Sequence, residues 1–179
     1  MTRFPFDVVA FDLDGTLADT APDLAAALNH ALAALGRPSV PAPSVRNLIG
    51  HGARALLRRG LAASDEAPES LVERGYPVFL DFYADHICDG SAPYPGVEAA
   101  LDAPQATGVA AALCTNKPER LARRLLAALG WDGRFAALVG GATLALRKPD
   151  PLPLLEAIAR AGGGRAAFVG DSITDADTA

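Results

Sequence analysis

Four short motifs carry side chains whose types suit phosphate chemistry. Their sequences are DLDGT at 12–16, TNKP at 115–118, RKPDP at 147–151 and GDSITD at 170–175. They supply acids, a hydroxyl and a lysine, namely Asp12, Asp14, Asp171, Asp175, Thr115 and Lys148. Acids gathered in one pocket repel each other unless a cation joins them. An all-oxygen, acidic set favours a hard ion such as Mg²⁺, which also binds substrate phosphate.

The spacing of the first two acids supports such a pocket. Asp12 and Asp14 lie two residues apart, so in extended backbone their side chains point to the same side. Lys148 adds a fixed positive charge. Thr115, expected at a helix start, offers a hydroxyl beside backbone N–H groups that favour an anion. Together these groups describe a site that binds and stabilises a phosphoryl group.

Strands and helices must alternate to bring the motifs to one place. Apolar runs predict strands at 6–11, 109–114, 135–140 and 166–170, and helices are predicted at 118–129 and 151–161. This alternation is typical of an α/β fold with a Rossmann-like parallel sheet covered on both faces. In such sheets ligands bind beyond the carboxyl ends of the strands, where the motifs or the loops that carry them lie.

The chain between the first strand and the rest of this pattern has only helical signals. One helix is predicted to begin at Thr20, where Thr20 and Asp23 match a capping box, and to stop at Gly36. Further helices are predicted at 44–49, at 53–63 and from Pro77 onwards.

The predicted domain organisation follows from this break in pattern. We expect an α/β core formed by residues 1–17 and 92–179, interrupted by an inserted all-helical domain of residues 18–91.

Composition excludes some classes of function. The net charge of -5, without a basic stripe, argues against nucleic acid as a partner. No apolar run reaches the roughly 18–20 residues needed to cross a bilayer. The N-terminal segment also lacks the apolar region of a signal peptide, so we expect a cytoplasmic protein. Cys88 and Cys114 have no metal-ligand spacing and are expected to be small buried side chains in a reducing compartment.

In this order, the four motifs resemble those of the haloacid dehalogenase (HAD) superfamily of aspartate-nucleophile phosphatases. The TNKP form, the YPGV stretch at 94–97 and the helical insert resemble the phosphoglycolate phosphatases within it. The resemblance implies a HAD core with an inserted all-helical cap. It also implies a Mg²⁺-dependent phosphatase that hydrolyses a small phosphate monoester through an aspartyl-phosphate, with 2-phosphoglycolate as the leading substrate.

The resemblance further implies a role for each matched residue. Asp12 would be the nucleophile that attacks phosphorus. Asp14 would protonate the leaving alcohol and then deprotonate the hydrolytic water. The residues expected to hold the phosphoryl group are Thr115, Asn116 and Lys148. The expected Mg²⁺ ligands are Asp12, the main-chain carbonyl of Asp14, Asp171 and Asp175.

The helical insert resembles a mobile cap that closes over the site and excludes water. In this subfamily a cap loop helps to choose the substrate, and the matching stretch is IGHGARALL at 49–57. The specificity candidates are His51, Gly52 and Arg54 from this loop, and Lys117 from the core. The expected partner is a small phosphorylated metabolite, with no nucleic acid or membrane, and the expected oligomeric state is a monomer or homodimer.

Two alternatives use the same residues. A phosphomutase, an isomerase of the same superfamily, would use the same nucleophile but return the phosphoryl group to a sugar. The second alternative is an inactive truncated chain, because similar proteins continue with a helix and a strand where this sequence stops at GDSITDADTA. We therefore expect the C-terminal part of the core to be missing from this sequence. A dehalogenase does not fit, since that chemistry needs neither the Asp14 acid/base nor the Mg²⁺ ligands.

Overall fold

A computed structural model describes residues 5–64 and 66–179, which form two compact units. The first consists of the chain up to Asp19 together with Pro93–Ala179, and the second is Thr20–Ala92. The boundaries expected from the sequence lie within two residues of these junctions. Each unit is described separately below.

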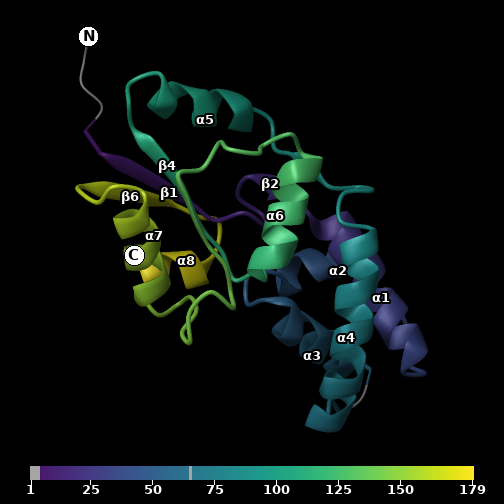
Figure 1. Cartoon of the computed structure of the whole chain (residues 1–179). Coiled ribbons are helices and arrows are strands. Elements are labelled where there is room, and N and C mark those ends of the chain that lie inside the picture. Colours follow the sequence, from purple (N-terminus) through teal and green to yellow (C-terminus); the bar gives the residue numbers. More distant parts are fainter. Residues whose placement is uncertain (1–4, 65) are drawn as a thin grey trace. The chain divides into compact units, whose positions relative to one another are not determined.

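The first unit is built on a parallel sheet (Figure 1). Its strands run in the order β5-β4-β1-β6, so the strand that leads to Asp12 lies inside the sheet. Every strand falls within a range predicted from the sequence, which confirms the α/β fold class. The strand bounds are Val8–Phe11 for β1, Ala110–Cys114 for β4, Ala137–Val139 for β5 and Ala166–Val169 for β6.

Strands β4 and β6 pair with β1 so that their first residues lie side by side. Val8 of β1 lies opposite Ala110 of β4 and Ala166 of β6. At the other end, Phe11 lies opposite Leu113 and Val169. The carboxyl ends of these three strands therefore meet at one edge, where a ligand site of an α/β sheet is expected.

Both faces of the sheet are packed with apolar side chains. Alternate strand residues such as Val8, Ala112 and Val139 form one cluster with Leu154 and Ala157. The latter two belong to helix α7 (Leu152–Arg160). The strand residues between them point to the other face, and those that are buried there include Val9, Phe11 and Leu113. Burial on both faces of β1, β4 and β5 explains why these strands read as continuous apolar runs. Strand β6, at one edge of the sheet, is less buried, and its Val169 is exposed.

The remaining elements of this unit surround the sheet. Helix α5 (Val97–Gln105) packs beside β4, and helix α6 (Glu119–Ala128) contributes a buried leucine face. A short helix α8 (Ile173–Thr178) follows β6. A separate two-stranded sheet joins β2 (Ala18–Asp19) to β3 (Ala92–Pro93), at the two points where the chain passes between the units.

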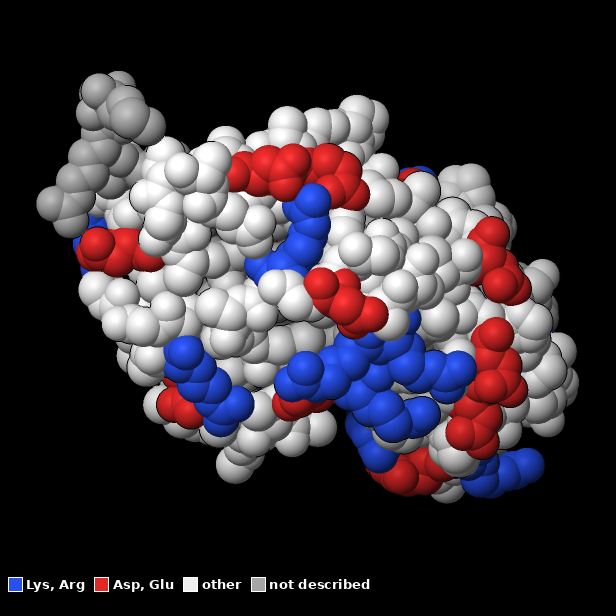
Figure 2. All heavy atoms as spheres, turned by 45° about the horizontal axis from the view of Figure 1, so that its top comes forward, with Lys and Arg blue, Asp and Glu red and all other residues white. Residues whose placement is uncertain are grey.

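Some surface charges of the α/β unit form ion pairs within their own helix. Arg123 contacts Glu119 at 2.7 Å, and Arg160 contacts Glu156 at 2.7 Å, each one helical turn away. On the face shown in Figure 2, basic side chains border acidic ones.

Within residues 5–64 and 66–179, no helix is both long enough and apolar enough to span a membrane.

The second unit is helical. Its elements are α1 (Ala21–Ala34), α2 (Ala42–Val45), the 3-10 turn η1 (Arg46–Leu48), α3 (Ala53–Ala62) and α4 (Glu69–Asp85). Helix α4 packs against α1 and α3 (Figure 1). Helical backbone is present where a helix was predicted at 44–49, but the prediction of one helix was wrong, because the stretch divides into α2 and η1. The helical backbone ends at Ile49, which is extended, and Gly50 and Gly52 follow at positive φ.

The predicted start of the last helix was also wrong. Helix α4 begins at Glu69, and Pro77 lies inside it rather than at its start. Proline removes one helical hydrogen bond. The buried side of α4 nevertheless runs across the proline, from Val72 to Phe79 and Tyr83, and this packing outweighs the local preference.

The capping box predicted at the start of α1 does not form. Thr20 makes no side-chain capping hydrogen bond. The Asp23 carboxylate instead accepts hydrogen bonds from the Gly90 N–H at 2.8 Å, the Ser91 N–H at 2.8 Å and the Ser91 hydroxyl at 2.6 Å. Asp23 is buried, so these donors from a distant segment compensate its charge better than one N–H of its own helix.

Replacement of Asp23 by Ala should therefore destabilise the helical unit. The substitution leaves the buried Ser91 N–H and hydroxyl without an acceptor, and we expect the free energy of unfolding to fall by about 2–4 kcal/mol. Urea denaturation measures this loss. The matched control is Asp81→Ala, at an exposed position of α4, which should not lower the value by more than about 0.5 kcal/mol. Equal effects of the two substitutions would contradict the role given to Asp23.

Candidate active site

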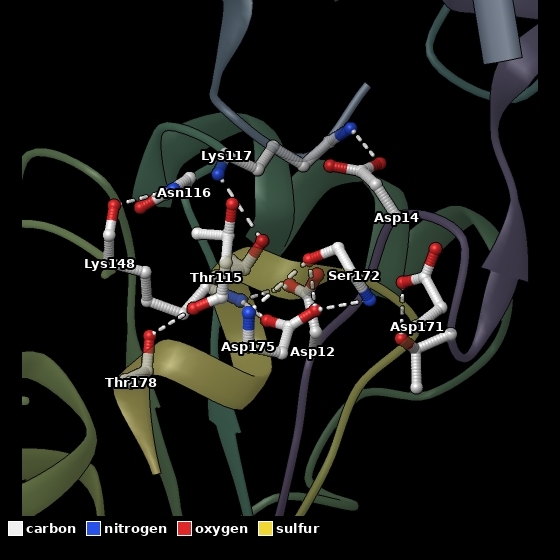
Figure 3. A network of polar contacts seen from close by, with 12 residues as sticks. Asp12, Asp14, Thr115, Asn116, Lys117, Lys148, Asp171, Ser172, Asp175 and Thr178 are labelled. Atoms are coloured by element: carbon white, nitrogen blue, oxygen red, sulfur yellow. Dashed lines mark hydrogen bonds and ion pairs between the residues drawn. The ribbon is translucent and has the colours of Figure 1, made fainter. Parts of the chain in front are cut away.

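The four motifs meet at the carboxyl edge of the sheet. Asp12 follows the last residue of β1, Thr115 follows β4, and Asp171 lies two residues beyond β6. Lys148 comes from the loop between β5 and α7. Figure 3 shows their side chains converging from these segments.

Asp12, Lys148 and Asp175 form the buried centre of the site. The Lys148 ammonium lies 3.0 Å from Asp12 Oδ1 and 2.5 Å from Asp175 Oδ1. All three side chains are at most 5% exposed. One lysine therefore bridges two carboxylates in a place that water hardly reaches.

The pKa values of this centre reflect that burial. Burial raises the pKa of Asp12 from 3.8 to about 6, although Lys148 opposes the shift, and the charges of Asp175 and Asp14 add to it. Burial alone would lower the pKa of Lys148, but its contacts with Asp12 and Asp175 raise that pKa above its usual value. The lysine is thus held charged, while the Asp12 carboxylate needs more positive charge than Lys148 supplies.

Asn116 holds the loop that carries Lys148. Its side-chain amide donates a hydrogen bond to the main-chain carbonyl of Lys148 at 3.1 Å. This contact gives the buried Asn116 a structural role, and its direct contact with phosphate stays a prediction.

Thr115 is buried beside the same loop. Its hydroxyl oxygen accepts a hydrogen bond from the Lys117 N–H at 3.2 Å, which tightens the turn that follows β4. The expectation that Thr115 stands at a helix start was wrong, because α6 begins at Glu119 after the cap residue Pro118. The proline, which is favoured at the entrance to a helix, moves that start along the chain.

Asp14 lies on a tight loop and forms an ion pair with Lys117. The loop closes through hydrogen bonds from the Leu17 and Ala18 N–H groups to the Leu13 carbonyl, at 3.0 and 3.1 Å. The Lys117 ammonium lies 2.7 Å from Asp14 Oδ1. Lys117 is almost fully buried, with 2% of its side chain exposed, against 13% for Asp14.

Asp171 completes an acidic cluster with Asp12 and Asp175. Each residue offers a carboxylate oxygen, and these oxygens lie within 4.8 Å of one another. The Thr16 hydroxyl donates to Asp171 Oδ1 at 2.7 Å. Gly15 has a φ of +90°, and a Cβ at this position would lie 2.4 Å from Asp171 Oδ2. Glycine is therefore required there both for the backbone conformation and for the approach of Asp171.

Asp175 is held by protein donors on both of its oxygens. Lys148 contacts Oδ1, while the Ser172 N–H and hydroxyl donate to Oδ2 at 3.1 and 2.5 Å. The Asp175 N–H in turn donates to the Ser172 hydroxyl at 3.3 Å, which completes a capping box at the start of α8. These contacts fix the Asp175 carboxylate beside Lys148.

The charges of the site fit a divalent cation. The site contains four acidic side chains, Asp12, Asp14, Asp171 and Asp175, but only two lysines, Lys117 and Lys148. The oxygen donors and their spacing suit a hard ion that takes oxygen ligands.

A cysteine nucleophile does not fit this site. Cys114 is buried directly before Thr115, and burial raises the pKa of its thiol to about 12. A thiol with that pKa stays protonated near neutral pH and is a poor nucleophile. Cys114 is thus the small core side chain expected, whereas Cys88 is only half-buried.

The remaining specificity candidates belong to the helical unit. Arg54 forms ion pairs with Glu73 and Glu69, the latter at 3.9 Å, and its guanidinium lies 4.3 Å from the centre of the Tyr76 ring. Gly52 is the cap residue of α3 at a φ of +84°, and His51 beside it is half-buried. A role of these three residues in substrate choice stays a prediction.

Sequence reasoning missed two residues that support the site. Thr16 orients Asp171, and Ser172 orients Asp175. Ser172 carries a readable signal, because Ser172 and Asp175 match the S-x-x-D pattern of a capping box. Thr16 carries none, since its partner lies 155 positions away in the sequence.

Comparison with known proteins agrees with this geometry. The haloacid dehalogenase-like hydrolase family matches residues 6–179. A phosphoglycolate phosphatase of Mesorhizobium japonicum is 46% identical over 175 residues, which cover 96% of this chain and 77% of that protein. The one from Agrobacterium fabrum is 44% identical over 179 residues, covering 98% and 77%.

A solved structure supports the same assignment. The crystal structure of a predicted phosphoglycolate phosphatase from Haemophilus somnus has a TM-score of 0.89 and 34% identity, and the match covers 99% of this chain and 81% of that one. The chain therefore belongs to the haloacid dehalogenase-like hydrolases, and within them it is similar to the phosphoglycolate phosphatases.

Proposed function

We propose that this protein is a Mg²⁺-dependent phosphatase that hydrolyses 2-phosphoglycolate to glycolate and phosphate through an aspartyl-phosphate. The observation that carries the proposal is the position of Asp12, buried at the end of β1, in contact with Lys148 and grouped with Asp171 and Asp175. The substrate follows from the names of the relatives at 44–46% identity.

The first step uses Asp12 as the nucleophile. A carboxylate oxygen of Asp12 forms a bond to phosphorus while the bond from phosphorus to the ester oxygen breaks. Asp14 gives its proton to that leaving oxygen, which departs as the alcohol. Lys148, already 3.0 Å from Asp12, offsets negative charge on the phosphoryl oxygens as the step proceeds.

The second step returns the enzyme to its starting state. Water attacks the aspartyl-phosphate, Asp14 takes a proton from that water, and phosphate leaves with the Asp12 carboxylate regenerated. The residues that would hold Mg²⁺ are Asp12, the main-chain carbonyl of Asp14 and Asp171, with Asp175 supporting them from beside Lys148. Bound there, the ion would supply positive charge that the two lysines alone do not provide.

Replacement of Asp12 by Asn tests the nucleophile. Because the amide cannot form the phosphoenzyme, phosphate release from 2-phosphoglycolate should fall at least about a thousandfold. A colorimetric phosphate assay in the presence of Mg²⁺ measures it. Asp177→Asn, at an exposed position of α8, is the matched control and should retain wild-type turnover.

Two results would contradict this assignment. Retained turnover in the Asp12→Asn variant would remove Asp12 from the role of nucleophile. Interconversion of sugar phosphates by the wild type, without release of phosphate, would instead support a phosphomutase.

The metal assignment is tested by Asp171→Asn. The substitution removes one charge from the acidic cluster but keeps the size of the side chain, so Mg²⁺ affinity should fall at least about tenfold. Titration calorimetry on the protein without substrate measures the dissociation constant, and Asp177→Asn again serves as control. An unchanged constant would place the ion elsewhere.

The burial of Asp12 predicts an unusual stability profile without metal. Because the folded state raises the pKa of Asp12 from 3.8 to about 6, it retains a proton that the unfolded chain loses between these values. The protonated Asp12 therefore contributes to the free energy of unfolding below about pH 4. This contribution falls as the pH rises and is lost above about pH 6, and it amounts to about 3 kcal/mol in total.

The Asn side chain does not ionise, so the Asp12→Asn variant does not lose stability in this way as the pH rises. In EDTA at pH 8 the variant should therefore be more stable than the wild type by up to about 3 kcal/mol. The difference should vanish towards pH 4. Urea denaturation across this pH range measures it, and added Mg²⁺ should stabilise the wild type more than the variant. A difference that is independent of pH would show that Asp12 is not the group responsible.

A further inference from the structure

The ion pair between Lys117 and Asp14 is the feature that the proposed chemistry leaves unexplained. The two side chains meet at 2.7 Å, and the lysine is almost fully buried. In Figure 3 their contact lies apart from the contacts that Lys148 makes with Asp12 and Asp175. The site therefore holds two buried lysines with different acidic partners.

A buried ammonium requires an anion beside it, because its desolvation is otherwise uncompensated. Lys148 meets that requirement with two carboxylates, Asp12 and Asp175. Lys117 meets it with Asp14, the residue that the proposed mechanism needs for proton transfer to the leaving group. The Lys117 ammonium therefore contacts the side chain that must also face the leaving group.

The position of Lys117 indicates which part of the substrate it meets. A general acid lies within about 3 Å of the oxygen it protonates. The Lys117 ammonium lies 2.7 Å from Asp14, so it borders the place that the leaving oxygen must occupy. In 2-phosphoglycolate a carboxylate is attached one carbon away from that oxygen and would fall within reach of Lys117.

We propose that Lys117 binds the carboxylate of the leaving group when substrate binds. The inference rests on the proposed function and adds a selection rule to it. Phosphate monoesters that carry an anionic group one carbon from the ester oxygen gain this contact with Lys117. Monoesters of neutral alcohols lack the contact and have a lower kcat/KM.

Two substrates of similar size distinguish this rule from a general role in catalysis. 2-Phosphoglycolate carries the carboxylate, whereas 2-hydroxyethyl phosphate has a hydroxyl group in its place. The wild type should prefer the first in kcat/KM by at least about thirtyfold. In Lys117→Met, kcat/KM for 2-phosphoglycolate should fall by at least about thirtyfold, mostly through KM. The value for 2-hydroxyethyl phosphate should change by no more than about threefold.

Two further variants complete the experiment. Arg120→Met, at an exposed position of α6, removes a positive charge from the same region and should leave the substrate preference unchanged. Lys117→Arg keeps the charge but moves it, and should reduce the preference less than Lys117→Met does. If Lys117→Met does not fold, a change of at least about threefold in the preference of Lys117→Arg supports the same role, and an unchanged preference opposes it.

The outcomes separate this inference from the proposed function. Equal losses for both substrates in Lys117→Met would overturn it, because Lys117 would then act only by positioning Asp14. A wild type that hydrolyses both substrates equally would also overturn it, while the phosphatase function would stand. A wild type that hydrolyses neither would overturn the proposed function itself.

Discussion

Asp12 holds a carboxylate where water is almost excluded, and Lys148 favours the charge of that carboxylate while Asp175 and Asp14 oppose it. Burial penalises the ionised form strongly enough to raise the pKa of Asp12 to about 6, even with Lys148 at 3.0 Å. A nucleophilic carboxylate must be ionised, so the site needs positive charge that the chain supplies only in part. The neighbouring Asp171 and Asp175 carboxylates add negative charge, so the proposed cation is what would meet this shortage.

The supports of the site come from segments that are far apart in the sequence. Asn116 fixes the loop of Lys148, Ser172 fixes Asp175, and Thr16 fixes Asp171. Each supporting hydrogen bond therefore orients a charged group whose own position matters for the chemistry. These contacts position Lys148 and Asp171, which lie in loops, and Asp175, which lies in the first turn of α8.

The sequence predicted the parts of this structure that local patterns determine. Strands β1, β4 and β5 are continuous apolar runs because both of their faces are packed, and polar residues beyond the strand ends mark the site. Partners chosen by tertiary contacts were not predictable. Thr20 and Asp23 match a capping pattern, yet Asp23 binds Gly90 and Ser91, whereas the capping box that does form uses Ser172 and Asp175. Lys117 was predicted to meet substrate, but its pairing with Asp14 depends on a loop 103 residues away.

The register in which β1 pairs with β4 and β6 has a consequence for the evolution of such proteins. Phe11 lies beside both Leu113 and Val169, so the distance between the first and last motifs is set by strand pairing and not by chain length. A slip of one residue would shift a motif by about 3.3 Å and turn its side chain to the other face. Insertions between strands carry no such penalty, and the whole of Thr20–Ala92 is accommodated between β1 and β4. The fold thus accepts large additions outside the sheet while it tolerates almost no change of length within it.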